Sequence, residues 1–180
     1  MRAYHWLASV TVILVTAPRL AAQGGPKATA VRVGAVRLEP ARSLLHSLVG
    51  RWRFEIRFAG NYDGAPDVSG TRVVTALFDD LRLQWTEEVD HSEIRSQGII
   101  GFDSRSGRFY GTSVNSGGTG AEFMTGTLDQ GEPLVTFSPL APSSPDRQLM
   151  ESFTLSLIDR DHFTWAPLDR GWRAVFTREP

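Results

Sequence analysis

Hydrophobic and polar residues alternate along most of this chain after residue 50. The clearest run is RWRFEIRF at 51–58, in which Trp52, Phe54, Ile56 and Phe58 alternate with charged residues. Alternation with a period of two is typical of a β-strand that buries one face. Turn residues divide the pattern into about ten predicted strands, at 51–58, 68–78, 82–89, 93–103, 107–115, 120–129, 133–138, 147–159, 161–167 and 171–178.

A helical pattern precedes the first strand. In ARSLLHSLV at 41–49, Leu44, Leu45 and Leu48 fall on one helical face, and Gly50 follows as a residue that commonly ends helices. The sequence therefore predicts one short N-terminal helix followed by an all-β domain.

Short polar turns connect the predicted strands, which favours an antiparallel meander in which neighbours along the chain are neighbours in the sheet. A sheet of this size has to protect its two edges, and closing into an up-and-down barrel removes both. We therefore predict a barrel, which at this strand number has room for a ligand-sized cavity. A β-sandwich is the alternative.

The first 23 residues have the features of a secretory signal peptide. Arg2 provides a positive start, residues 6–17 are largely apolar, and small residues favour cleavage after Ala22 or Gln23. The apolar run is too short to span a bilayer, and the chain has no cysteine for a lipid anchor. An uncleaved anchor is the alternative. We predict a signal peptide at 1–23, a disordered leader at 24–40, a barrel domain at 41–180, and a periplasmic or secreted protein with no membrane span after cleavage.

Alternation also predicts which side chains face the barrel interior. All tryptophans after the predicted signal peptide fall in the inward phase: Trp52, Trp85, Trp165 and Trp172. Large aromatic residues in this position either fill the interior or line a pocket for an apolar ligand. The predicted cavity lining is Trp85, Glu87, Glu151, Phe153, Trp165 and Trp172.

Three ionisable residues share the inward phase, namely Glu87, Glu151 and Arg178. A lone carboxylate inside a barrel is unfavourable unless it is paired or hydrated. These positions therefore line a wet cavity, or pair with arginines, or the strand phase slips there. Two carboxylates in one cavity are able to perform acid–base chemistry or to bind a cationic or hydroxylated ligand, and Glu122 is a weaker third candidate.

Composition and motifs exclude several functional classes. The formal net charge is -1, so nothing indicates a nucleic-acid partner. The chain has no nucleophile-elbow serine, no HExxH and no Walker sequence, and its histidines do not occur at ligand spacing. His162 is out of phase with Phe163 and is predicted to face outward, which argues against a haem ligand. We predict no metal site and no cofactor.

Several short motifs occur in a recognisable order: LVGRW at 48–52, GIIGFD at 98–103 followed by GRFY at 107–110, DHFTW at 161–165 and FTR at 176–178. In these motifs the chain resembles the DUF1579 family, a group of uncharacterised and often exported bacterial proteins. The resemblance covers residues 42–179. It implies a lipocalin-like, calycin-type barrel and no established activity.

A broader similarity is to lipocalins, in which a Gly-x-Trp after a short helix opens the first strand and an arginine of the last strand lies over the tryptophan. Gly50, Trp52 and Arg178 match these positions. The similarity implies that they form a structural plug at the closed end of the barrel. This chain has no cysteine and has more strands than secreted lipocalins, so no lipocalin ligand is transferred to it.

Three hypotheses about function follow. The leading one is an exported lipocalin-like barrel that binds a small apolar or amphipathic molecule. The second is an enzyme that uses Glu87 and Glu151 on a small substrate. The third is a scaffold in which the barrel is filled and the outer face binds a partner. Binding is favoured over catalysis.

Overall fold

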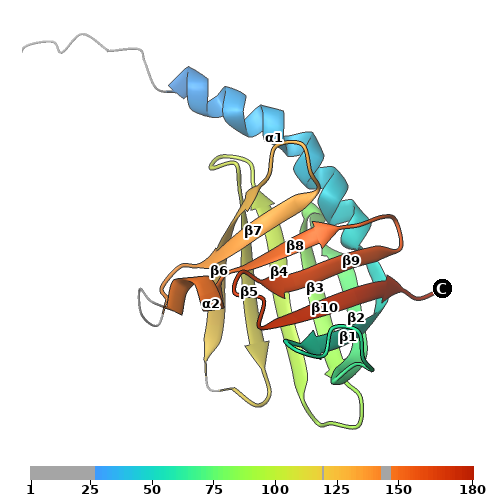
Figure 1. Ribbon diagram of the computed structural model, residues 1–180. Coiled ribbons are helices and arrows are strands. Elements are labelled where there is room, and N and C mark those ends of the chain that lie inside the picture. Colours follow the sequence, from blue (N-terminus) through green and yellow to red (C-terminus); the bar gives the residue numbers. More distant parts are fainter. Residues whose placement is uncertain (1–26, 119, 143–146) are drawn as a thin grey trace, which may run out of the picture.

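The chain folds as a closed β-barrel with one long helix at its N-terminal side (Figure 1). The computed structural model describes residues 27–118, 120–142 and 147–180, and the predicted signal peptide at 1–23 lies outside them. The elements in chain order are α1 (Lys27–Leu48), β1 (Gly50–Phe58), β2 (Val68–Leu77), β3 (Asp79–Val89), β4 (Arg95–Asp103), β5 (Arg108–Asn115), β6 (Ala121–Leu128), β7 (Leu134–Pro139), α2 (Gln148–Glu151), β8 (Phe153–Leu157), β9 (His162–Pro167) and β10 (Trp172–Arg178).

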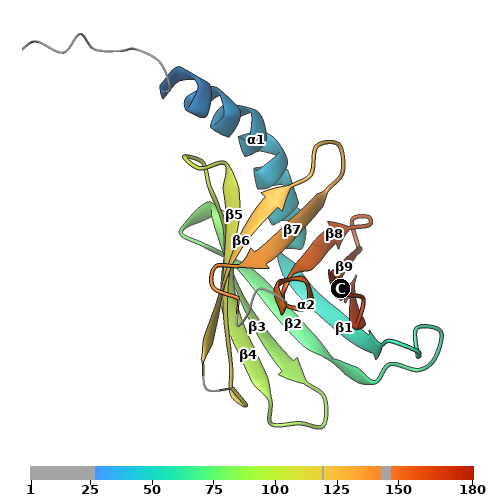
Figure 2. The same cartoon turned by 60° about the vertical axis from the view of Figure 1, so that its left-hand side comes forward.

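The strands form an up-and-down barrel in which each strand pairs antiparallel with its neighbours along the chain. The first and last strands close the ring, because β1 pairs with β10 from Trp52 opposite Arg178 to Phe58 opposite Trp172. Figure 2 shows the strands curving around a common interior. The predicted barrel is confirmed, and a sandwich is excluded because a single sheet closes on itself.

The helix α1 is longer than predicted and begins at Lys27 instead of Ala41. The segment predicted as a disordered leader, 24–40, is therefore helical from Lys27 onward. Pro40 lies within the helix, where a proline removes one backbone hydrogen bond, and the helix continues through it. The end of α1 packs against β3 and β4, while its first part extends away from the barrel (Figure 1). Among the described residues, no helix is both long enough and apolar enough to cross a membrane.

One end of the barrel is filled by side chains from α1 and from the strands. Leu45 of α1, Trp52 of β1 and Phe163 of β9 are each no more than 1% exposed. The Trp52 and Phe163 rings meet edge to face with their centroids 4.7 Å apart, and Phe163 stacks on Phe176 at 4.2 Å. Burying each of these side chains contributes about 1.5–3 kcal/mol to stability. This filled end is the hydrophobic core of the domain.

Arg178 connects the last strand to the end of α1 and to Trp52. Its guanidinium carbon lies 4.1 Å from the centroid of the Trp52 ring, within the range of a cation–π contact. The same guanidinium donates hydrogen bonds to the carbonyl oxygens of Ser47 and Val49, each at 2.8 Å. The indole Nε1 of Trp52 donates to the carbonyl oxygen of Leu48 at 2.8 Å. These bonds satisfy carbonyl groups that a helix end leaves without intrahelical partners.

Gly50 occupies the point where the chain turns from α1 into β1. Its φ angle is +143°, a conformation that residues with a Cβ rarely adopt. A Cβ atom at this position would also overlap Nη1 of Arg178. Glycine is therefore required here both for the backbone conformation and for the close approach of the arginine.

Two details of the predicted strand pattern are wrong. Phe58, predicted to face inward, is 48% exposed, because it is the last residue of β1 and lies beyond the packed interior. The predicted strand at 147–159 is divided into α2 and the shorter strand β8. Glu151 therefore lies in a helical turn and not on a strand.

Candidate functional site

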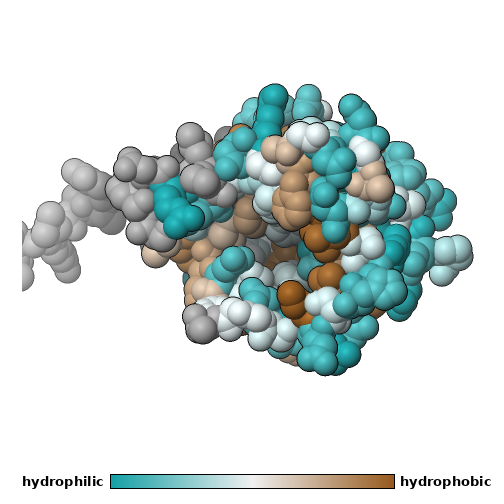
Figure 3. Space-filling view, turned by 60° about the horizontal axis from the view of Figure 1, so that its bottom comes forward, coloured by the Kyte–Doolittle hydropathy of each residue, from teal (hydrophilic) through white to brown (hydrophobic). Residues whose placement is uncertain are grey.

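The barrel encloses a cavity of about 830 Å³ beside its filled end. Figure 3 views the molecule from below and shows a hollow in this surface with hydrophobic side chains inside it. Every strand from β2 to β10 contributes to the lining, together with α2. The interior is therefore filled at one end and hollow at the other.

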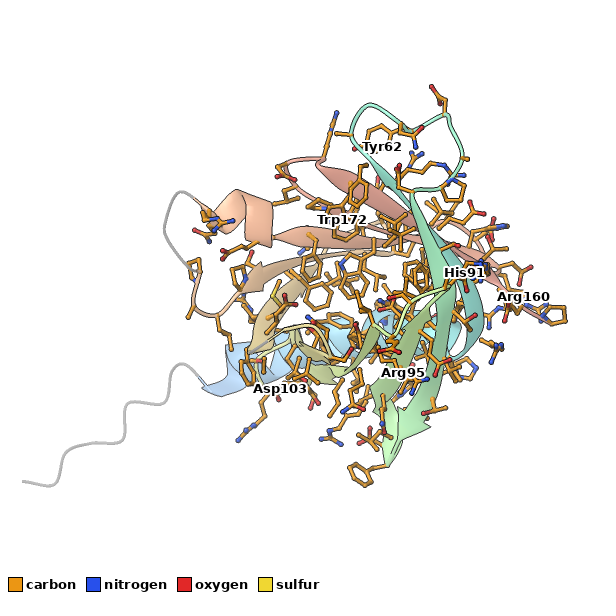
Figure 4. The ribbon with its side chains drawn as sticks, turned by 90° about the horizontal axis from the view of Figure 1, so that it is seen from below. Tyr62, His91, Arg95, Asp103, Arg160 and Trp172 are labelled. Carbon is orange, nitrogen blue, oxygen red and sulfur yellow. The ribbon has the colours of Figure 1, made fainter. Side chains whose placement is uncertain are left out.

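All six residues predicted to line the cavity do so: Trp85 and Glu87 from β3, Glu151 from α2, Phe153 from β8, Trp165 from β9 and Trp172 from β10. The strand residues lie there because side chains at every second position of a strand share one face. Glu151 lies there for a different reason, since α2 brings it to the cavity. In Figure 4, which is seen from below, Trp172 lies inside the ring of strands and Tyr62 lies in the loop outside it.

Three aromatic side chains form one wall of the cavity. The ring of Trp165 stacks on that of Phe137 with the centroids 6.1 Å apart. Phe153 lies 4.8 Å from Trp165 and 5.8 Å from Phe137, measured between ring centroids. Such a wall offers a large, rigid and apolar contact surface to a ligand.

The sequence prediction missed one central residue, Arg72 of β2. It is 8% exposed and lies directly opposite Glu87 of β3, and its Nη2 is 3.1 Å from Oε1 of that glutamate. Its guanidinium carbon lies 4.6 Å from the ring centroid of Trp85, 5.1 Å from that of Trp165 and 4.5 Å from that of Phe176. Inward carboxylates were expected to line a wet cavity or to pair with an arginine, and Glu87 does both.

The inward position of Arg72 follows from one observation in the structure and one in the sequence. Arg72 lies two residues after Gly70 and two before Val74, which are both buried, so it shares their inward phase. An inward Glu87 on the following strand also calls for a cation nearby, because a buried carboxylate needs a partner. Together these two observations point to an arginine on the second strand.

Arg72 separates the cavity from the filled end of the barrel. It lines the cavity, and it also borders a void of about 10 Å³ that touches Leu48 of α1 and Phe163 of β9. The guanidinium therefore forms part of the cavity floor.

The other ionisable groups of the described lining are carboxylates. Glu122 of β6, the weaker third candidate, lines the cavity and accepts a hydrogen bond from the Ser113 hydroxyl at 2.7 Å. Glu151 lies in the same lining. Among the described residues, the lining therefore contains one cation, Arg72, and three carboxylates, those of Glu87, Glu122 and Glu151.

Other charged contacts lie on the outer side of the barrel, outside this lining. Arg53 donates to both carboxylate oxygens of Asp90, and the Ser69 hydroxyl donates to one of them at 2.7 Å. These bonds lower the pKa of Asp90 to about 2, and the hydrogen bond from Arg53 is the largest cause.

The histidine His162 contacts Asp159 across a turn, with Nδ1 2.9 Å from Oδ1. Within residues 27–118, 120–142 and 147–180, no group of three or more histidines, aspartates and glutamates is arranged to hold a metal ion.

Comparison with known proteins places these features in a family. The comparison with curated proteins gives no match. A family model described as "Protein of unknown function (DUF1579)" matches residues 38–166, which begin in α1 and extend into β9. The match covers more than half of the sequence and agrees with the lipocalin-like closed barrel, and the chain therefore belongs to the DUF1579 family.

Proposed function

We propose that this protein binds a small apolar or amphipathic molecule inside its barrel. The observation that carries the proposal is the cavity of about 830 Å³, which falls in the range of roughly 300–1,000 Å³ typical of small-molecule sites. One of its walls is aromatic, and polar groups converge on it from separate elements. A scaffold that used only its outer face would have no need for this space.

Binding accounts for the lining better than acid–base catalysis by Glu87 and Glu151. A general base has to take up a proton and release it again. The carboxylate of Glu87 already lies 3.1 Å from the guanidinium of Arg72, so it faces a counter-ion on the neighbouring strand. The ion pair is therefore better suited to orienting a ligand than to exchanging protons with one.

We also propose that binding takes place in the periplasm or outside the cell, on the basis of the signal-peptide pattern at 1–23. N-terminal sequencing of protein recovered from a periplasmic fraction tests this. A mature chain that starts after Ala22 or Gln23 is expected. Recovery of the full-length chain in the cytoplasm alone would contradict the proposal.

Gly111 offers a variant that fills the cavity without disturbing its wall. It lines the cavity on β5, and a Cβ atom there would have its nearest neighbour at 3.8 Å, an ordinary van der Waals distance. We expect Gly111→Trp to weaken binding of the neutral apolar dye Nile red. Thr75→Leu is the matched control, because Thr75 is exposed and lies outside the lining.

The assay is the fluorescence of Nile red, followed by displacement with a panel of neutral and charged lipophiles of eight to twelve carbons. Saturable binding is expected for the wild type and for Thr75→Leu, and weaker binding for Gly111→Trp. Circular dichroism verifies that both variants are folded. The proposal is wrong if the wild type shows neither saturable binding nor a response to any member of the panel. Equal binding by Gly111→Trp would place the dye outside the cavity and would also contradict it.

A further inference from the structure

Arg72 has hydrogen-bond donors without acceptors at the floor of the cavity. A guanidinium carries five N–H groups. Within the described part of the chain, the contact of Nη2 with Glu87 is the single polar contact of this side chain. Nε is enclosed by protein atoms, so the donors that face the cavity are those of the two Nη atoms. Buried donors in native proteins almost always have an acceptor. The floor of the cavity therefore lacks an acceptor that the described side chains do not supply.

The surroundings of Arg72 leave the cavity as the source of this acceptor. The rings of Trp85, Trp165 and Phe176 pack against the guanidinium, and none of these side chains carries an oxygen that could accept a hydrogen bond. The void toward Leu48 measures about 10 Å³, close to the minimum for one water, and a buried water typically makes about three hydrogen bonds. None of the side chains that border this void is a hydrogen-bond acceptor.

The charges of the lining favour an uncharged acceptor over a carboxylate. Glu87 already provides the counter-charge of Arg72, and its side chain is 16% exposed. A ligand carboxylate at the same guanidinium would lie beside that of Glu87, and like charges repel strongly where water is scarce. A cationic ligand would be attracted by Glu87, but it has no lone pair to offer the donors of Arg72.

We infer that the cavity selects a neutral molecule with a carbonyl or similar uncharged oxygen on an apolar body, and that Arg72 donates to this oxygen. The inference rests on the proposed function and names the ligand class for the same cavity. The apolar body lies against the aromatic wall of Phe137, Phe153 and Trp165. Glu87 holds the guanidinium in place from the neighbouring strand.

Three ligands with the same ten-carbon chain test the inference by isothermal titration calorimetry: decan-2-one, decanoate and decylammonium. We expect decan-2-one to bind at least about tenfold more tightly than either ion, the factor expected for one hydrogen bond from a charged donor. Equal or tighter binding of decanoate or decylammonium would overturn the inference.

A double variant tests the role of Arg72 directly. Arg72→Met with Glu87→Met removes both charges and keeps similar side-chain volumes, a change that buried ion pairs often tolerate. The preference for the ketone should disappear. The matched control is Arg95→Met with Glu88→Met, which removes an exposed Arg–Glu pair with 73% and 71% side-chain exposure. The control should keep the preference, and a preference that survives in the cavity variant would refute the role of Arg72.

If the cavity variant does not fold, a measurement on the wild-type protein tests the role of Arg72 instead. The carbonyl ¹³C resonance of labelled decan-2-one should move downfield on binding, relative to its position in hexane, because it accepts a hydrogen bond from a cation. A bound resonance at the hexane position would overturn the inference. Nile red binding without a preference for the ketone refutes this inference alone, whereas the absence of all binding refutes the proposed function as well.

Discussion

Trp52 is predicted to stabilise the fold more than any tryptophan that lines the cavity. Its side chain is fully buried, its ring meets Phe163 edge to face, and its Nε1 donates to the carbonyl of Leu48. Replacing a buried Phe or Trp with Ala typically costs about 3–5 kcal/mol. The Trp52→Ala variant should lie in the upper half of that range, because it also leaves the Leu48 carbonyl without its donor and Arg178 without the ring beneath it.

The change is measurable as a shift of the urea midpoint. A loss of about 4 kcal/mol with an m-value of about 2 kcal/mol/M lowers the midpoint by about 2 M. Since small domains are stable by about 5–15 kcal/mol, most of the variant should still be folded in buffer. Far-ultraviolet circular dichroism is the suitable probe, because the substitution removes one of the fluorophores.

Trp172→Ala is the matched control for Trp52→Ala. The Trp172 side chain is partly exposed where it lines the cavity, so truncating it leaves little new void and should cost less than about 1.5 kcal/mol. Similar midpoints for the two variants would refute the assignment of Trp52 as the structural plug. A Trp52→Ala variant with unchanged stability would refute it equally.

Two further predictions concern pH and backbone conformation. The pKa of Asp90 is lowered to about 2, mainly by Arg53, so its ionised form stabilises the fold above about pH 4, and this contribution is lost as the pH falls toward about 2. The melting temperature of Asp90→Asn should therefore fall less than that of the wild type between pH 4 and pH 2. Parallel curves of melting temperature against pH would contradict the pairing. Gly50→Ala should cost about 1–3 kcal/mol in strain and further stability through displacement of Arg178, which differential scanning calorimetry would record as a melting temperature lower by at least about 3 °C. A Gly50→Ala variant that melts with the wild type would show that the arginine tolerates a Cβ.

The strands were predictable because a barrel buries one face of every strand, so the same two-residue period recurs in each. The prediction failed where burial of one face does not set the pattern. The helix α2 is a single turn of four residues, too short to show a period of 3.6. The amphipathic pattern at 41–49 does not extend to the earlier residues of α1. Pro40 also indicated that the helix begins after it, whereas the helix begins at Lys27.

The aromatic part of the site was predictable for the same reason, since Trp85, Phe153 and Trp165 lie on strands with clear alternation. Arg72 was not predicted because Val73 and Val74 are adjacent, so alternation alone does not assign the phase of β2. The register with the neighbouring strands decides it, because Arg72 lies opposite Trp52 on one side and Glu87 on the other. Such pairing depends on contacts between distant segments, which a single sequence does not state.

The contact between Arg178 and Val49 joins residues that are 129 positions apart, and it has a consequence for the order of folding. The strand that seals the ring, β10, is the last strand along the chain, and it also carries the arginine that caps α1. During synthesis, the open edge of β1 and the carbonyl groups of Ser47 and Val49 therefore lack these hydrogen-bond partners until β10 has been made. Because such long-range pairing slows folding, closure of the ring should be a late step in the folding of this barrel.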